Sequence, residues 1–208
     1  MDITAIVGPM GAGKTTEAIE RFREDNVIVY DFLNTRNSER DLRNVLKRSI
    51  DSVSPVFHHL MESFSIPKSV ALCSCPPIIM VDELHFVDVF KKRDEFMDFL
   101  GRLVDLEEND VSVIVAGIYY DFYNNYEVFP VWHDLNDFAH RNEFGYNIIH
   151  LPSLTPCHFC KGEDRVYFTA NVSGNNERVG DHYVNVCHSC KGKALGSPKS
   201  RKQAEGCL

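Results

Sequence analysis

The 208-residue chain lacks any long hydrophobic run. No stretch approaches the roughly 18 apolar residues that a membrane-spanning helix needs. A secretory signal peptide is not expected either, because Met1 leads directly into the short, strand-like apolar segment 3–7. These two absences predict a protein that has no membrane partner and that resides in the cytoplasm.

The chain also lacks the basic excess of a broad nucleic-acid-binding surface. It carries 22 lysines and arginines against 30 aspartates and glutamates, which gives a formal net charge of −8. Binding of many backbone phosphates requires the opposite balance, so no nucleic-acid partner is expected, whereas a small anionic ligand is compatible with this charge. The shares of hydrophobic and charged residues, 44% and 25%, fit an ordinary globular protein without internal repeats.

What the sequence contains is an alternation of apolar segments typical of strands with amphipathic segments typical of helices. The predicted strands cover residues 3–7, 27–29, 78–81 and 111–116, and the predicted helices cover residues 15–23, 38–47 and 96–106. Continuous β-branched strands occur in parallel sheets that are covered on both faces. The pattern therefore predicts an α/β fold of the P-loop NTPase type, with a mostly parallel sheet and helices on both faces.

Residues 8–15 match the phosphate-binding pattern in which a glycine and four further residues precede Gly-Lys-Ser/Thr. The segment lies between a predicted strand and a predicted helix, which disfavours the alternative of a chance glycine-rich turn. In such a loop Lys14 would reach the β and γ phosphates of ATP, and Thr15 would hold Mg²⁺. The residues predicted here to bind phosphate are Gly8, Pro9, Met10, Gly11, Ala12, Gly13, Lys14, Thr15 and Thr16.

Two adjacent acids, Asp82 and Glu83, follow the predicted buried strand 78–81. In phosphate-loop proteins a carboxylate at the end of a neighbouring buried strand completes the metal site, so Asp82 is predicted to bind Mg²⁺ and ATP phosphates. Glu83 could take the proton from an attacking hydroxyl as a general base. The alternative is that both acids merely cap the segment after the strand.

Four of the seven cysteines form two Cys-x-x-Cys pairs, which are separated by 26 residues. Four thiolates suit Zn²⁺, and a closed four-sulfur shell leaves no position for water, so the metal is predicted to be structural and to fix the base of the intervening loop. A redox role, or a ligand from His158 or His188 in place of a thiolate, is the alternative. The predicted zinc ligands are Cys157, Cys160, Cys187 and Cys190.

Together these motifs resemble those of the cellular and bacterial type of thymidine kinase. The resemblance is carried by Gly-Pro-Met-x-x-Gly-Lys-Thr, by Asp-Glu-x-x-Phe after a strand, by Ala-Gly-Ile-x-x-Asp-Phe at a later strand end, and by cysteine pairs around a loop. These segments follow the family's order and cover residues 3–190. The resemblance implies phosphoryl transfer from ATP, with Mg²⁺, to the 5′-hydroxyl of thymidine, giving dTMP in nucleotide salvage.

The same resemblance implies roles for individual residues. Glu83 matches the family's proposed general base, and Arg36 matches an arginine near the phosphates. The loop between the cysteine pairs, called the lasso in the family, folds over the nucleoside base, and Tyr183 would pack beside it, although a plain core role is the alternative for this aromatic residue. The implied nucleoside-binding residues are Met10, Phe86, Phe122, Val179, Gly180 and Tyr183.

The chain departs from the family's usual pattern where the base is recognised. His85 stands where the family usually has glutamine, Tyr119 stands where it usually has aspartate, and Gly180 lacks the adjacent glycine that is common there. A kinase for deoxyuridine or a modified pyrimidine is therefore one alternative, and a zinc-ribbon P-loop ATPase or binding module is another. Because members of this family form tetramers, the resemblance implies a homo-oligomer.

The composition changes after about residue 150, where prolines and the first cysteine pair replace the alternation of strands and helices. Beyond this point two strand-like pieces, 165–169 and 182–186, flank a polar segment rich in glycine and asparagine. The predicted parts are a P-loop nucleotide-binding kinase domain at 1–150, a zinc-binding lasso domain at 151–195 and a flexible basic tail at 196–208.

Overall fold

The computed structural model of the protein describes residues 1–21, 27–31, 56–59, 64, 78–105, 111–162, 166–171 and 183–195. The chain divides into two compact units, each of them discontinuous in sequence. The first comprises Met1–Val7, Lys14–Gly117 and Pro130–Ile149, and the second comprises Gly8–Gly13, Ile118–Phe129 and His150–Leu208. The division into successive domains at residues 150 and 195 remains a prediction.

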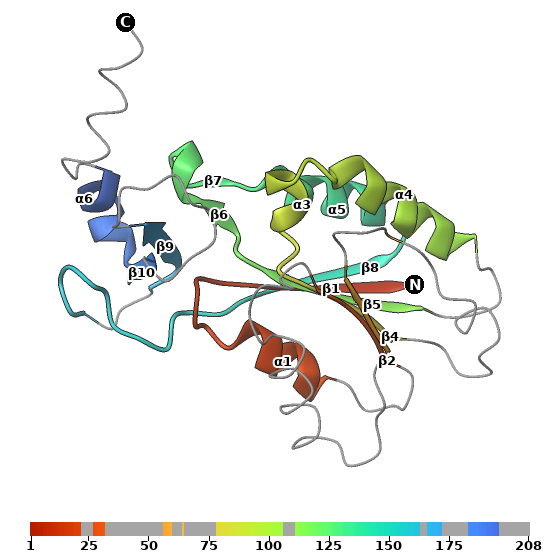
Figure 1. The fold of residues 1–208 in the computed structure, drawn as a ribbon, viewed down its shortest axis with the longest axis horizontal. Helices are drawn as coiled ribbons and strands as arrows, with labels where there is room; N and C mark the ends of the chain where they lie inside the picture. The colour runs from red at the N-terminus through yellow and green to blue at the C-terminus, as the bar shows by residue number, and fades with distance from the viewer. Residues whose placement is uncertain are drawn as a thin grey trace, which may run out of the picture. The chain divides into compact units, whose positions relative to one another are not determined.

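Within the described residues, the first unit is built on a six-stranded sheet (Figure 1). In spatial order its strands are β3 (Val56–His59), β2 (Val27–Asp31), β4 (Ile78–Asp82), β5 (Ser112–Gly117), β1 (Asp2–Val7) and β8 (Gly145–His150). The pairs β3–β2, β2–β4, β4–β5 and β5–β1 are all parallel. The predicted α/β class with a mostly parallel sheet is therefore confirmed.

The central strands consist of apolar runs because both of their faces are covered. In β4, Ile79, Met80 and Val81 are each at most 1% exposed. The neighbouring β5 buries Val113 and Val115 completely. Such strands bury their side chains on alternate sides of the sheet, so both faces need a covering layer.

Helices supply these two layers (Figure 1). Helix α1 (Lys14–Glu20) lies on one face, and α3 (Phe86–Val89), α4 (Arg93–Val104) and α5 (Pro130–Arg141) lie on the other. The buried residues of α4 recur at the spacing of one helical face and are Phe96, Phe99, Leu100 and Leu103. Among the described residues, no helix combines the length and the apolar character that crossing a membrane requires.

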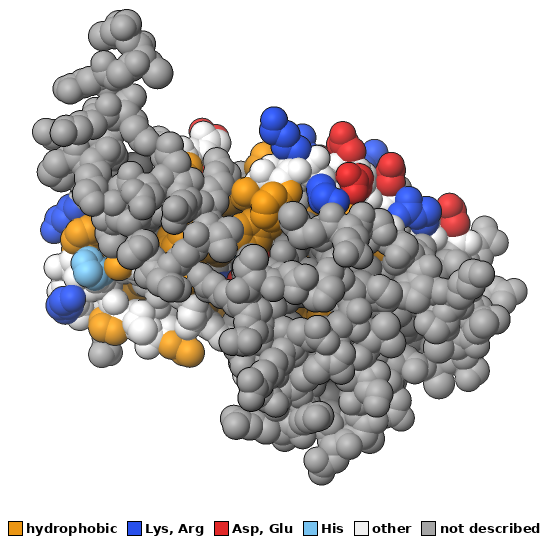
Figure 2. Space-filling model, in the orientation of Figure 1, with side chains coloured by type: hydrophobic (Ala, Val, Ile, Leu, Met, Phe, Trp, Pro, Cys, Tyr) orange, Lys and Arg blue, Asp and Glu red, His pale blue; other side chains and the backbone are white. Residues whose placement is uncertain are grey.

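The outer surface of these helices carries charges of both signs. Figure 2 shows acidic and basic side chains interspersed over the region of α4. Arg93 Nε lies 3.1 Å from Asp134 Oδ2, and Lys92 Nζ lies 3.5 Å from Glu95 Oε2. Exposed pairs of this kind contribute little to stability but keep the surface well solvated.

The described part of the second unit contains two small antiparallel hairpins. One pairs β9 (Phe168–Asn171) with β10 (Tyr183–Val186), and the other pairs β6 (Tyr120–Asp121) with β7 (Glu127–Val128). Short helical segments accompany them: η2 (Phe122–Asn124), η3 (His188–Cys190) and α6 (Lys191–Leu195). The core of this unit packs aromatic and aliphatic side chains around cysteines and consists of Tyr126, Cys157, Val166, Phe168, Ala170, Val186, Cys187 and Cys190.

The predicted elements differ from the observed ones mainly at their ends. Helix α4 begins three residues before the predicted segment 96–106, and β9 begins at Phe168, later than the predicted start at residue 165. The predicted helix 38–47 lies outside the described residues. Strands β3 and β8 and helix α5 were not predicted, although α5 begins with a proline, which is favoured at the first position of a helix.

Candidate active site and metal centre

The glycine-rich turn Gly8–Gly13 follows β1 and belongs to the second unit. Gly11 and Gly13 have φ angles of 68° and 79°, a region that side chains with a Cβ rarely adopt. The Ala12 N–H donates to the Pro9 carbonyl oxygen at 3.3 Å, which closes the turn. The backbone thus favours glycine at Gly13, which the phosphate-binding pattern fixes, and at Gly11, which the pattern leaves variable.

Lys14 and Thr15 begin α1 in the first unit. The Lys14 side chain is buried, with 7% of the residue exposed. Burial lowers the pKa of its ammonium group below the ordinary value, whereas the carboxylates of Glu83 and Asp82 act in the opposite direction. A buried lysine facing two acids is an arrangement typical of functional sites.

Thr15 and Asp82 are joined directly, since the Thr15 hydroxyl donates to Asp82 Oδ2 at 2.9 Å. Asp82 ends β4, and Oδ1 of the same carboxylate accepts the Glu83 N–H at 3.0 Å. Strand β4 is not the immediate neighbour of β1, because β5 lies between them. The two oxygen ligands predicted for Mg²⁺ nevertheless lie within hydrogen-bonding distance of each other.

Glu83 has an unusual backbone conformation, with a φ angle of 55°. Left-handed backbone is uncommon for residues other than glycine and is concentrated at functional sites. Glu83 Oε2 lies 3.5 Å from His85 Nδ1, and 29% of the Glu83 side chain is exposed. Because the residue that caps α3 is His85, neither acid is the cap of that helix.

Of the three residues that depart from the usual family pattern, Gly180 lies outside the described residues, and the other two lie in different units. His85 is 4% exposed, and its ring lies 4.4 Å from that of Phe86. Tyr119 packs edge-on against Tyr120 and His150, with ring centroids 4.9 Å apart in both pairs. Each of these two departures is therefore packed within its own unit.

The predicted nucleoside-binding residues are also divided between the units. Phe86 belongs to the first unit, where it is buried and stacks on Phe90 at 5.5 Å. Met10, Phe122 and Tyr183 belong to the second, in which Phe122 packs against the Tyr126 ring at 5.5 Å. Three predicted site residues lie outside the described residues: Arg36, Val179 and Gly180.

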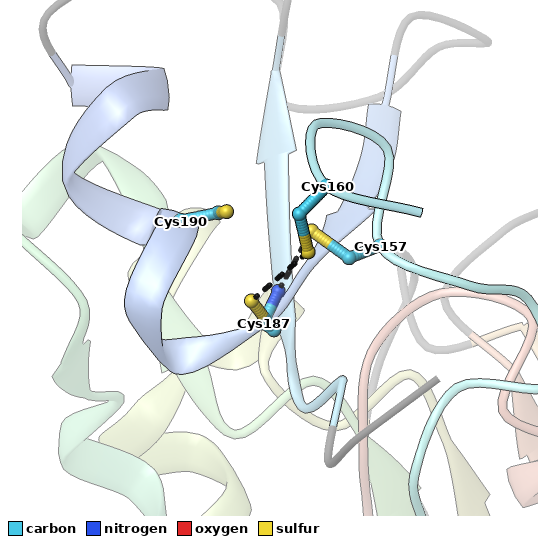
Figure 3. Close-up of side chains that lie close together, drawn as sticks. All are labelled: Cys157, Cys160, Cys187 and Cys190. Atoms are coloured by element: carbon cyan, nitrogen blue, oxygen red, sulfur yellow. Dashed lines mark hydrogen bonds between the residues drawn. The ribbon is translucent and has the colours of Figure 1, made fainter. Parts of the chain in front are cut away.

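The four cysteines predicted to bind zinc come together in the second unit (Figure 3). Their Sγ atoms all lie within 4.8 Å of one another, and those of Cys160 and Cys187 are 3.8 Å apart. The Cys187 N–H donates to the Cys157 sulfur at 3.4 Å. His158 and His188 are exposed and are not part of the cluster, so within the described residues the clustered set that could hold a metal consists of thiols alone.

The surroundings of these thiols affect their protonation. Burial raises the pKa of the Cys157 thiol, but hydrogen bonds from the backbone of Cys160, Cys187 and Phe159 outweigh this effect and lower it to about 6. Burial and the neighbouring cysteines raise the pKa of Cys190 to about 12. Hydrogen bonds to a sulfur stabilise its thiolate, which is the form that binds metal.

Sequence reasoning missed two polar residues of the second unit, Thr169 and Asn185. The Thr169 hydroxyl accepts the Met10 N–H at 2.8 Å, and Asn185 Nδ2 donates to the Met10 carbonyl at 2.9 Å. The sequence contained one indication of a role for Asn185. Asparagine is depleted in strands, and Asn185 interrupts the apolar pattern of β10.

The sequence is similar to those of known proteins. The sequence model of the thymidine kinase family matches residues 1–191. A thymidine kinase of Mycoplasmoides gallisepticum is 29% identical over 126 residues, which cover 58% of this chain and 50% of that relative. The matched region thus spans about half the length of the relative. Because the family model covers well over half of the sequence, the chain belongs to the thymidine kinase family.

Proposed function

We propose that the protein transfers the γ-phosphoryl group of ATP to the 5′-hydroxyl of thymidine. The observation that carries this proposal is the hydrogen bond between Thr15 and Asp82, which joins the end of the phosphate-loop pattern to the acid after β4. Membership of the thymidine kinase family and the name of the matched relative support the choice of substrate. A cytoplasmic location is part of the same proposal.

In this function Lys14 would neutralise the β and γ phosphates of ATP, and the turn before it would direct backbone N–H groups at them. Thr15 and Asp82 would hold Mg²⁺, which supplies further positive charge next to the transferred phosphoryl group. The polar atoms fit this ion, because a hydroxyl and a carboxylate converge at 2.9 Å. Thr16 and Arg36 complete the proposed phosphate-binding set.

Glu83 would act as the general base. It follows Asp82 directly, and its partly exposed carboxylate is accessible to an acceptor hydroxyl. The proton of the 5′-hydroxyl would pass to this carboxylate as the oxygen attacks the γ-phosphorus. A residue in this role must lie within hydrogen-bonding distance of the hydroxyl when the nucleoside is bound.

The four cysteines would hold a structural Zn²⁺. With Zn–S bonds of about 2.3 Å, a tetrahedral site has sulfur atoms about 3.8 Å apart. The Cys160 and Cys187 sulfurs lie 3.8 Å apart, as such a site requires, and all four sulfurs lie within 4.8 Å of one another. Because all four ligand positions would be sulfur, the metal would anchor the segment between the cysteine pairs and take no part in the chemistry.

Purified protein with Mg-ATP is expected to form dTMP with thymidine and to release little ADP without a nucleoside. The measurement is a coupled ADP assay with a panel of thymidine, deoxyuridine and other pyrimidine deoxynucleosides. The residues proposed to bind the nucleoside, from the family resemblance, are Met10, Phe86, Phe122, Val179, Gly180 and Tyr183. Equal ADP release with and without nucleoside would identify an ATPase and contradict the kinase proposal, and a preference for deoxyuridine would revise only the acceptor.

A homo-oligomer, and specifically a tetramer, is the expected assembly. Sedimentation equilibrium is expected to give a mass about four times the 23.8 kDa of one chain. This expectation rests on the family alone, so it is independent of the assignment of the active-site residues. A mass of one chain across the concentration range would reject it.

A further inference from the structure

The β9–β10 hairpin holds both polar backbone groups of Met10, a residue of the glycine-rich turn. The Met10 N–H donates to Thr169 Oγ1 at 2.8 Å, and its carbonyl accepts from Asn185 Nδ2 at 2.9 Å. These partners are separated from Met10 by 159 and 175 residues in the sequence. All three residues belong to the second unit. The conformation of the turn at Met10 therefore depends on two side chains from distant strands.

Each of these side chains is itself held in place. Thr169 is 3% exposed, and its hydroxyl lies 3.5 Å from Asn185 Oδ1. Asn185 Nδ2 also lies 2.7 Å from Ser153 Oγ and 3.1 Å from Thr155 Oγ1. Thr169 is the buried member of this network, and the loss of one member would leave its polar partners unsatisfied.

The same hairpin is joined to the cysteine cluster. The Asn185 carbonyl accepts the His158 N–H at 2.9 Å, inside the first cysteine pair. Asn185 also precedes Cys187 by two residues, and the Cys187 N–H donates to the Cys157 sulfur at 3.4 Å. Figure 3 shows the cysteines of both pairs facing one another. A single residue thus bonds the glycine-rich turn through its side chain and the first cysteine pair through its backbone.

We propose that Asn185, assisted by Thr169, is a positioning residue that couples metal binding at the cysteine cluster to phosphate binding by the glycine-rich turn. The inference rests on the proposed ATP-binding role of residues 8–15. A metal bound by both cysteine pairs would hold the β9–β10 hairpin in place, and the hairpin in turn would hold the backbone at Met10. Such a coupling is reciprocal, because each ligand changes the affinity for the other by the same factor.

Two variants test the coupling. Asn185→Leu removes the amide at similar size, and Thr169→Val removes the hydroxyl at nearly constant shape. Leaving the Met10 carbonyl or N–H without its partner is expected to weaken Mg-ATP binding roughly tenfold. The measurements are the dissociation constant of Mg-ATP by calorimetry, the zinc content and the melting temperature of each purified protein.

Two further variants separate positioning from general stability. Thr169→Ser keeps the hydroxyl and is expected to bind Mg-ATP as the wild type does. Val184→Ala removes apolar contact from the same hairpin, so it is expected to lower the melting temperature without changing ATP affinity. ATP affinity that follows the melting temperature across all four variants would show a merely structural role and overturn the proposal.

The reciprocal effect supplies a second readout that does not depend on turnover. Zinc transfer from the wild type to a colorimetric chelator is expected to slow in the presence of Mg-ATP, and this protection is expected to disappear in Asn185→Leu. If the wild type binds Mg-ATP but transfers zinc equally fast with and without it, the proposed coupling is overturned, whereas the proposed function is not affected. A wild type that binds no Mg-ATP would instead contradict the proposed function.

Discussion

Replacing Glu83 by glutamine is expected to lower the turnover number for thymidine by a factor of about 10² to 10⁴, the contribution typical of a general base. The side chain keeps its size but can no longer take the proton of the 5′-hydroxyl. The dissociation constant of Mg-ATP is expected to change little, because Lys14, Thr15 and Asp82 remain in place. Single-turnover kinetics with saturating substrates measure the loss directly.

A suitable control for this variant is Glu95→Gln. Glu95 is an exposed acid of α4 that pairs only loosely with Lys92, at 3.5 Å, and it lies outside the proposed site. Its replacement removes the same charge from the protein and is expected to leave turnover within about twofold of the wild type, since exposed ion pairs contribute little. A Glu83→Gln enzyme with the turnover of this control would exclude Glu83 from proton transfer.

Replacing Cys187 by serine is expected to reduce zinc from about one ion per chain to below about a tenth, because a structural site needs all four ligands. Cys187 supplies one of the four clustered sulfurs, and its N–H bonds to another, that of Cys157. Loss of the metal is also expected to lower the melting temperature, since the core of the second unit includes three of these cysteines. Elemental analysis and calorimetry measure the two effects.

The histidines beside the cysteines provide the matched controls for this experiment. His158→Ala and His188→Ala change exposed neighbours of the cluster without removing a sulfur. Both variants are expected to retain zinc. Full zinc occupancy in Cys187→Ser, or its loss in either histidine variant, would contradict the four-thiolate site.

The parts of the fold that the sequence predicted well are those whose signal is local. Strands β1, β4 and β5 are continuous apolar runs, and a parallel sheet covered on both faces requires such runs. Strand β8 was missed because its residues alternate irregularly between exposed and half-buried positions. Helix α5 was not predicted, although its apolar residues, which include Trp132 and Leu135, recur at helical spacing in the sequence.

In the candidate site, too, the residues with a local sequence pattern were predicted and those without one were not. Gly13 and the four cysteines were predictable, because their spacing along the chain follows patterns that are typical of phosphate and metal sites. The proximity of Thr15 and Asp82 could be expected from the pattern, but the intervening strand β5 could not. The bond between Met10 and Asn185 joins residues 175 positions apart, a pairing that a single sequence does not encode in any local pattern.

The division of the phosphate-loop pattern between the two units has a consequence for exchanging segments among members of the family. The turn Gly8–Gly13 belongs to the unit that also contains residues 150–208, whereas Lys14 belongs to the unit of the sheet. A chimera that takes its last sixty or so residues from a relative would replace the hydrogen-bonding partners of Met10 while keeping the native turn. Recombination in this family is therefore best designed with two matched crossovers, so that the N-terminal turn and the C-terminal hairpin come from the same parent.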